Sequence, residues 1–291
     1  MKQTNLIKIE KLIKIERKKI FKYDLHVHSN YSTDGEMTIE QACEKAINLG
    51  LDGIAITDHL DFDFPHDEGE SFPLIDFKKY GRHIERLRNI YDKTSFKIFK
   101  GIEAGIQPHV IKETSDIIKK FDFDYVIASV HIIEGMDPYK GMYYKDKTKK
   151  EAYEKYLLKI IEMINNFEDF DNVGHFEYII RCACYDDKML RYNEYSDLFD
   201  EIFKLLIRKG KGFELNTGSF RDNPGIKAAE FDFCILKRYR ELGGEIISLG
   251  SDAHNTCYIG YKFPYFKELV KQAGFNYLTF FEKRKPLFEK I

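Results

Sequence analysis

Six of the nine histidines in this 291-residue chain stand in short clusters, and each cluster follows an apolar, strand-like run. A glutamate and several aspartates share this placement. In chain order the clusters read Asp24-Leu-His26-Val-His28, Thr57-Asp58-His59, Gly-Ile-Glu103-Ala-Gly, Ser129-Val-His131, Gly174-His175 and Ser251-Asp252-Ala-His254. Neutral imidazoles and carboxylates are natural ligands of zinc, iron and manganese. The pattern therefore predicts one multinuclear metal centre.

The spacing within the clusters supports this prediction. His26 and His28 are two residues apart on an expected strand, so both side chains point to one face and can reach a single ion. The same applies to Asp252 and His254 unless that pair lies in the following loop. Glu103 can give one oxygen to each of two ions, and paired ions about 3.5–4 Å apart are usual in the hydrolysis of phosphate esters. In that chemistry the cations lower the pKa of a bridging water, and the hydroxide attacks phosphorus in line.

The elements that must position these residues alternate along the chain from residue 21. We expect strands at 22–28, 53–58, 96–103, 125–131, 172–176, 212–216 and 245–249, and helices at 38–49, 76–91, 110–120, 150–165, 193–209, 224–242 and 263–273. Residues 275–281 are a candidate for one more short strand. Thr38 and Gln41 form a capping-box pattern, and Pro224 suits a first helical turn. Seven or eight such units predict right-handed βαβ connections and a parallel, closed barrel, whose catalytic face lies at the C-terminal strand ends.

The motifs resemble those of the PHP (polymerase and histidinol phosphatase) superfamily. Its early H-x-H, T-D-H, G-x-E, S-x-H, G-H and late S-D-x-H occur here in order, from His26 to His254. The resemblance covers nearly the whole chain after residue 20. Within the superfamily the chain is most similar to the histidinol-phosphate phosphatases, through residues 49–59, 123–127, 212–217 and 280–286.

This resemblance implies a distorted (β/α)7 barrel over residues 21–291, after an N-terminal extension of residues 1–20. It also implies three divalent ions, of zinc, iron or manganese. The first ion would be held by His26, His28, Glu103 and Asp252, the second by Glu103, His131 and His175, and the third by Asp34, His59 and His254. Many relatives carry a histidine where Asp34 stands, and a carboxylate favours harder ions. The implied reaction is the hydrolysis of L-histidinol phosphate to L-histidinol and phosphate in histidine biosynthesis, with Glu103, Asp252 and His254 as catalytic residues.

Phosphate chemistry also needs donors outside the metals. Arg181 and Arg221 each follow an expected strand end, and a planar guanidinium suits phosphate oxygens. Asn216 is a further candidate for contact with the substrate. An imidazole- and amine-bearing substrate would suit an acidic rim, for which the candidates are Asp61, Asp63, Asp67, Glu68 and Glu70. His66 and His109 lie in loops of the same face, and we expect His83 at the surface.

Composition excludes several other functions. The formal net charge is −2, from 46 basic and 48 acidic residues, which gives no reason to expect a nucleic-acid partner. We find no apolar run near the roughly 18 residues of a membrane span. The five cysteines have no repeated spacing, so a reducing cytoplasm fits best. Residues 1–20 repeat Ile-Lys-Ile-Glu and lack the features of a secretory signal. The oligomeric state is not indicated.

Two other functions stay open at this point. The same metal face in this superfamily also cleaves nucleotides or other small phosphate monoesters, although a nuclease would need a basic groove. A metal-stabilised structural module is the non-enzymatic alternative, and its site would be coordinatively closed. Nine candidate ligands and two loop arginines favour catalysis.

Overall fold

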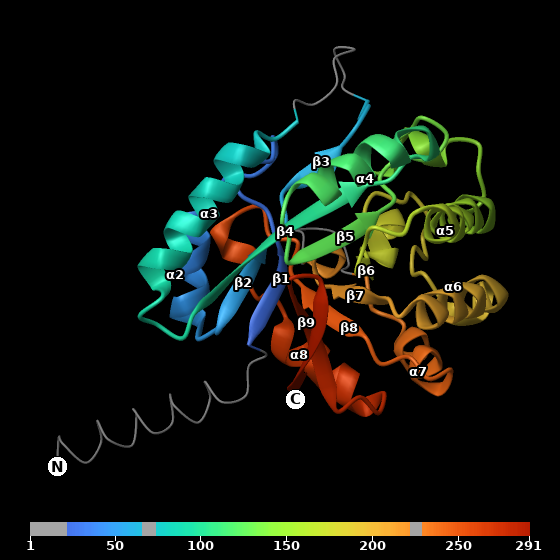
Figure 1. The fold of residues 1–291 in the computed structure, drawn as a ribbon. Coiled ribbons are helices and arrows are strands. Elements are labelled where there is room, and N and C mark those ends of the chain that lie inside the picture. Colours follow the sequence, from blue (N-terminus) through green and yellow to red (C-terminus); the bar gives the residue numbers. More distant parts are fainter. Residues whose placement is uncertain (1–21, 66–73, 222–228) are drawn as a thin grey trace.

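The computed structural model describes residues 22–65, 74–221 and 229–291, which alternate between strands and helices (Figure 1). The parallel strands are β1 (Tyr23–Val27), β2 (Gly53–Ile56), β3 (His59–Asp61), β4 (Lys97–Gly105), β5 (Tyr125–Ser129), β6 (Asn172–Val173), β7 (Gly212–Asn216) and β8 (Ile247–Gly250). The helices are α2 (Ile39–Leu49), α3 (Phe77–Tyr91), α4 (Ile111–Lys120), α5 (Lys149–Asn166), α6 (Ser196–Lys209), α7 (Phe233–Glu241) and α8 (Phe263–Gln272). The predictions for residues 1–20, for His66 and for Asp67, Glu68 and Glu70 fall outside the described residues.

The strands form a nearly closed barrel in the order β1-β2-β4-β5-β6-β7-β8, and β3 also pairs with β4. Its two ends meet where β8 runs past β1. There the His28 amide donates to the Ala253 carbonyl at 2.9 Å, and the Asp252 amide donates to the His26 carbonyl at 2.8 Å. This confirms the predicted (β/α)7 barrel, and it brings the first and last histidine clusters together.

The strand predicted at 53–58 is interrupted. Gly53–Ile56 pairs with the first half of β4, the chain then bends at Thr57 and Asp58, and His59–Asp61 pairs with the second half. The Asp58 carboxylate accepts hydrogen bonds from the Ser29 amide at 2.6 Å and the Ser32 hydroxyl at 2.7 Å. Asp58 therefore holds the loop after β1 in place.

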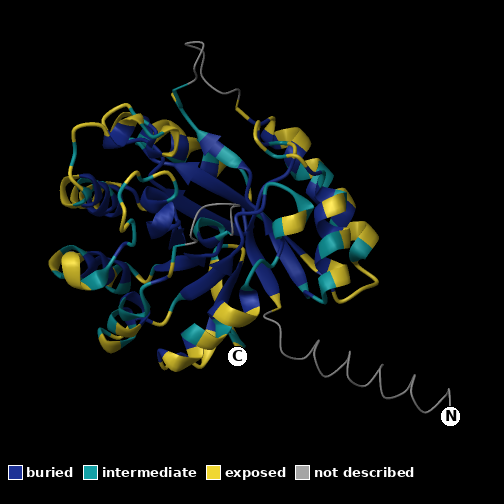
Figure 2. Cartoon of the chain, turned by 180° about the vertical axis from the view of Figure 1, so that it is seen from behind, coloured by how far each residue is buried: buried dark blue, intermediate teal, exposed yellow. Residues whose placement is uncertain are grey.

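The helices cover the outside of the barrel, and their outer faces carry most of the exposed residues while the strands are buried (Figure 2). The Thr38–Gln41 capping box is present at the start of α2. The helix predicted at 224–242 begins only at Phe233, because residues 229–232 are not helical and Asp232 caps α7, while Pro224 lies outside the described residues. None of the described helices is both long enough and apolar enough to cross a membrane.

The C-terminal segment is a hairpin rather than an eighth barrel strand. β9 (Tyr277–Glu282) pairs antiparallel with β10 (Lys285–Lys290), which the sequence did not predict. The Phe281 ring stacks on Tyr125 at the start of β5, with ring centroids 4.8 Å apart. The Phe280 ring lies 4.5 Å from that of Tyr23, at the start of β1. The hairpin thus packs at the N-terminal end of the barrel, opposite the histidine clusters.

Candidate metal centre

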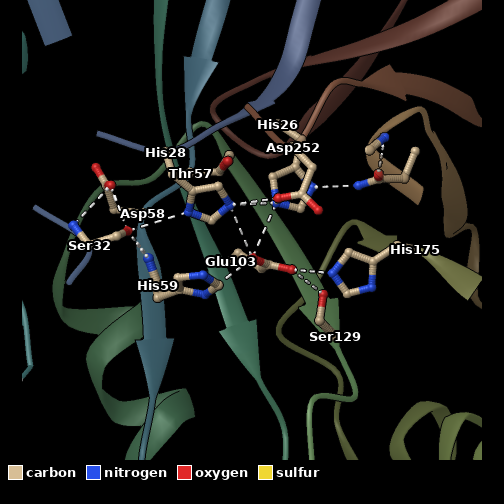
Figure 3. Close-up of polar contacts among 12 residues, drawn as sticks. His26, His28, Ser32, Thr57, Asp58, His59, Glu103, Ser129, His175 and Asp252 are labelled. Carbon is tan, nitrogen blue, oxygen red and sulfur yellow. Dashed lines mark hydrogen bonds and ion pairs between the residues drawn. The ribbon is translucent and has the colours of Figure 1, made fainter. Parts of the chain in front are cut away.

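The nine predicted metal ligands lie on the barrel face formed by the C-terminal ends of the strands, and Figure 3 shows six of them, His26, His28, His59, Glu103, His175 and Asp252. They are His26 and His28 from β1 and its end, Asp34 from the following loop, His59 at the start of β3, Glu103 in β4, His131 after β5, His175 after β6, and Asp252 and His254 after β8. The short parallel strands bring residues more than 200 positions apart to one end of the barrel. Most of these side chains are buried, while Asp34, His59 and His254 are partly open to solvent.

Glu103 stands at the centre of the cluster and is 1% exposed. Its Oε1 lies 2.8 Å from Nε2 of His175 and 3.1 Å from Nε2 of His131. The Ser129 hydroxyl donates to the same oxygen at 2.7 Å. One oxygen of Glu103 therefore faces the imidazoles that follow β5 and β6.

The other oxygen of Glu103 faces a different set of imidazoles. Oε2 lies 3.1 Å from Nε2 of His26, 3.3 Å from Nε2 of His28 and 3.2 Å from Nδ1 of His59. It is nevertheless a buried atom without a hydrogen-bond partner among the described residues. An unsatisfied buried carboxylate oxygen is costly, and the nearby nitrogens converge on it without donating. This donor set fits a bound cation.

Asp252 completes the group around His26 and His28. Its Oδ1 lies 3.3 Å from Nε2 of His28 and 3.6 Å from Nε2 of His26, and those two nitrogens are 2.9 Å apart. The backbone of Asp252 has a φ of 56°, in the left-handed region that is uncommon for a residue with a side chain. Such local strain is frequent at functional sites, where the surrounding contacts hold the residue in place.

Asp34 extends the cluster toward solvent. Its Oδ2 lies 3.1 Å from Nε2 of His254 and 3.6 Å from Nε2 of His59, and its side chain is 54% exposed. Nδ1 of His254 donates to the Asp252 carbonyl at 2.9 Å, which leaves Nε2 for the interaction with Asp34. The structure therefore brings together the three residues expected at a third ion.

Two carboxylates that orient histidines were not predicted as part of the site. Both oxygens of Glu214, in β7, lie 2.9 Å from Nδ1 of His26. Asp61, expected on an acidic rim, instead lies inside the cluster, with Oδ1 2.9 Å from Nδ1 of His131 and Oδ2 3.1 Å from Nδ1 of His59. The available signal for Glu214 was a carboxylate in the middle of an otherwise apolar strand, two positions before Asn216.

The charges of the cluster are mutually compensating. Burial favours a higher pKa for Glu103, but the imidazoles of His26, His131 and His59 hold that pKa well below its usual range. Burial also favours a higher pKa for Asp252, where the Arg181 guanidinium and the His26 imidazole outweigh it and hold the pKa well below normal. Both carboxylates are therefore anionic at neutral pH.

The two predicted phosphate-binding arginines line one cavity of about 430 Å³ beside the cluster. Arg181 donates through Nε to the Ser219 hydroxyl at 2.9 Å, and its other end contacts the carboxylate of Asp252. Arg221 donates to the Ser251 carbonyl at 2.9 Å, and its guanidinium lies over the Tyr258 ring at 4.2 Å. The Arg221 Nε has no hydrogen-bond partner in the described chain.

Asn216 lies behind the cluster rather than in the cavity. It is fully buried and is absent from the residues that line the cavity. Its side-chain amide donates to Glu214 at 2.9 Å, and its oxygen accepts from Arg181 at 3.3 Å. The contact between Asn216 and substrate stays a prediction, and the two hydrogen bonds favour a role in positioning Glu214 and Arg181.

The two other histidines in the described part of the chain, His83 and His109, are separate from the cluster. His109 is exposed and lies 3.2 Å from the exposed carboxylate of Asp63, and neither residue lines the cavity. His83 is partly buried rather than fully at the surface, with its ring nitrogens 3.2 Å from the Tyr31 hydroxyl and 2.9 Å from Glu40. Of the two described residues expected on the acidic rim, Asp61 lines the cavity but contacts imidazoles of the cluster, and Asp63 does not line it.

Comparisons with known proteins agree with this geometry. The PHP domain family model matches residues 24–218. The chain is 34% identical to a probable histidinol-phosphatase of Clostridium acetobutylicum, over 90% of this chain and 97% of the relative. It is 36% identical to a histidinol-phosphatase of Lactococcus lactis, over 91% of this chain and 96% of the relative.

A solved structure shares the fold over almost its full length. The crystal structure of histidinol phosphate phosphatase from Lactococcus lactis, complexed with zinc, L-histidinol and phosphate, matches with a TM-score of 0.84 and 35% identity. The match covers 92% of this chain and 99% of that one. The chain therefore belongs to the PHP domain family, among its histidinol-phosphatases.

Proposed function

We propose that this protein is a metal-dependent phosphomonoesterase that hydrolyses L-histidinol phosphate to L-histidinol and phosphate. The observation that carries the proposal is the position of Glu103, whose two oxygens face two different sets of imidazoles beside a cavity lined by Arg181 and Arg221. The relatives that are 34% and 36% identical over about nine-tenths of this chain are a probable histidinol-phosphatase and a histidinol-phosphatase. The five cysteines are all free, which supports a cytoplasmic location.

We assign three divalent ions to the cluster. The first is held by His26, His28, Glu103 and Asp252, the second by Glu103, His131 and His175, and the third by Asp34, His59 and His254. The contacts of Glu103 Oε2 with His26 and His28, and of Glu103 Oε1 with His131 and His175, support the first two sets. Imidazole-rich sets of this kind suit zinc and are also compatible with iron or manganese. When bound, the ions supply an acidified water and neutralise phosphate charge.

The side chains around the cavity perform the remaining steps. Arg181 and Arg221 bind phosphate oxygens, because guanidinium groups pair with phosphate in a fixed geometry. Ser219 and Asn216 hold Arg181 in position for this contact. Asp252 stays anionic beside Arg181, so it does not donate a proton to the leaving oxygen. His254 also lines the cavity, but its Nδ1 already donates to the Asp252 carbonyl and its Nε2 would be held by the third ion.

One paired measurement tests the proposal. The metal content of the purified protein is determined, and phosphate release from L-histidinol phosphate is compared with release from nucleotides and from p-nitrophenyl phosphate. We expect metal-dependent hydrolysis with a clear preference for L-histidinol phosphate. Metal-dependent activity on the aryl ester alone would reject L-histidinol phosphate as the substrate but would retain the assignment as a metal-dependent phosphatase. Bound metal without activity on any ester would favour a structural module.

A further inference from the structure

Four carboxylates of the described chain line the cavity, and one of them has no cationic partner. Asp34, Asp61 and Asp252 each lie against histidine or arginine side chains of the metal centre. The fourth, Asp137, is 7% exposed and forms no ion pair with any described residue. Burying a carboxylate without a cation is unfavourable, so its place in a ligand cavity calls for a positively charged ligand group.

The local structure fixes where Asp137 points. After β5 the chain reverses in a tight turn at Glu134 and Gly135, whose φ angles are 53° and 75°, and Ile133 and Met136 pair across it. Asp137 then caps a short helical turn, and its Oδ1 accepts from the Tyr139 amide at 2.8 Å. The Tyr178 hydroxyl donates to the same oxygen at 2.8 Å.

Both hydrogen bonds of this carboxylate with described residues therefore reach Oδ1. The second oxygen of Asp137 is left for a group inside the cavity. The bonds to Oδ1 fix the carboxylate before any ligand arrives, which reduces the ordering cost of recognition.

Two tyrosines that bond Asp137 also line the cavity, and the ring of Tyr178 lies beside the metal centre. The Tyr178 ring lies 5.0 Å from the His175 ring and 5.3 Å from the His131 ring, between centroids. The Tyr139 ring lies 6.3 Å from that of Tyr178 in a stacked arrangement, and both residues line the cavity. The faces of tyrosine rings attract cations, so the rings and the Asp137 carboxylate both favour a positively charged ligand group. The side chain of Tyr178 therefore lies between Asp137 and the proposed metal ligands His131 and His175.

We propose that Asp137 is the specificity-determining residue that binds a protonated nitrogen, ammonium or imidazolium, on the leaving group of the phosphate ester. The proposal rests on the phosphomonoesterase function assigned above. It divides the cavity between the arginines, which bind the phosphate, and Asp137, which binds the organic part. Asp137 would then take the role that the sequence predicted for an acidic rim, the binding of the cationic part of the substrate. Of the described rim candidates, Asp61 contacts imidazoles and Asp63 pairs with His109 outside the cavity.

The test is the Asp137→Asn variant, which keeps the shape of the side chain and an oxygen for the bonds from Tyr139 and Tyr178. We expect kcat/KM for L-histidinol phosphate to fall by about tenfold or more, mainly through KM, as for the loss of one charged hydrogen bond. The kcat/KM for p-nitrophenyl phosphate, which carries no cation, stays within about twofold of wild type. Inhibition of that reaction by L-histidinol weakens by a similar factor of about ten, and inhibition by inorganic phosphate does not change.

Matched variants separate recognition from folding. Asp63→Asn removes an exposed carboxylate outside the cavity and leaves both substrates unaffected. Tyr178→Phe removes one bond to Asp137 and gives a smaller loss that is again confined to the cationic ester. A parallel loss on both esters in Asp137→Asn, or no loss on either, overturns the proposal.

A separate comparison keeps this test distinct from that of the proposed function. If the wild type does not hydrolyse L-histidinol phosphate, phosphoethanolamine and glycerol phosphate replace it as esters with and without an ammonium group. Selectivity for phosphoethanolamine that disappears in Asp137→Asn supports the role of Asp137, and its absence in the wild type rejects it. Inhibition of aryl ester hydrolysis by ethanolamine or by imidazole, measured in both proteins, then identifies which protonated nitrogen binds.

Discussion

Glu214 contacts the imidazole of His26 on the side away from the other ligands, and both of its carboxylate oxygens lie 2.9 Å from Nδ1. Nε2 on the other side of the ring faces Glu103 and Asp252. A carboxylate at Nδ1 fixes the rotation and the tautomer of the ring, so that the lone pair of Nε2 points at the cluster. A Cβ at Gly250 would lie 2.5 Å from both Glu214 Oε2 and His26 Cβ, so the contact also requires glycine in β8.

The Glu214→Gln variant should therefore bind metal more weakly. We expect a loss of about tenfold to a hundredfold in affinity at the first site, because the amide is a weaker acceptor and no longer raises the basicity of His26. Competition against a chelator of known affinity measures this, and activity should return at high metal concentration. Glu245→Gln, at an exposed position, is the control. Unchanged metal affinity together with a lower melting temperature would instead give Glu214 a structural role only.

Removing the metal should destabilise the protein as well as inactivate it. Without cations, the buried oxygens of Glu103 and the surrounding imidazoles lose the partner that their arrangement requires. An ion present at about 1,000 times its Kd contributes about 4 kcal/mol of stability, and a chain of 291 residues unfolds with an entropy of about 0.6 kcal/mol per kelvin. The melting temperature should therefore fall by roughly 7 °C for each such ion that chelation removes. Scanning fluorimetry before and after chelation, and after the return of zinc or manganese, tests this. A melting temperature that chelation does not change would contradict the metal assignment.

The repeating strand-helix pattern was predictable because it is local, but its exceptions arise from distant contacts. The break between β2 and β3 depends on Asp58, which bonds Ser29 and Ser32 about 26–29 positions earlier. The hairpin turn at Lys283 and Arg284 has φ angles of 51° and 64°, and the Lys283 amide donates to Asp124 at 3.0 Å. No local sequence pattern predicts the hydrogen bonds of Asp58 with Ser29 and Ser32 or that of Lys283 with Asp124.

The metal centre was predictable to a similar degree. Eight of its nine predicted ligands lie in recognisable motifs at or near strand ends, and the barrel places these ends on one face. Asp34, in the loop after β1, belongs to none of these motifs. Glu214, Asp61 and Asp137 have no such motif, because their roles depend on which side chain from another strand or loop they meet. Asn216 shows the reverse case, since it follows the expected pattern yet is buried behind the cluster.

Arg181→Ala should weaken phosphate binding and leave the metals in place. We expect KM to rise by about tenfold or more, because a charged hydrogen bond to phosphate is lost. Inhibition by inorganic phosphate should weaken in parallel. Arg181 also contacts Asp252, so the metal content of the variant must be measured alongside its kinetics. Loss of bound metal would show that Arg181 mainly supports Asp252.

The free thiol of Cys43 should be inert in the folded protein. The side chain is fully buried, and burial raises the pKa of its thiol to about 12. Since the thiolate is the reactive form, almost none is present at pH 8, whereas the unfolded thiol titrates near its usual value of about 8.5. Titration with a thiol reagent should detect the exposed Cys182, Cys184 and Cys257 first and Cys43 only after denaturation. Rapid labelling of Cys43 in the native state would contradict its burial.

Replacement of Asp34 tests the third ion. Its Oδ2 faces Nε2 of both His254 and His59, at 3.1 and 3.6 Å, and the half-exposed side chain can change without disturbing the core. We expect Asp34→Asn to lower the metal content by one ion per chain and keep the other two, because an amide is a much weaker ligand than a carboxylate. Asp34→His should restore the ion and shift the preference toward zinc, since imidazole is the softer ligand. Elemental analysis of both variants, with Asp63→Asn as an exposed control, decides this. An unchanged metal content in Asp34→Asn would remove Asp34 from the ligands.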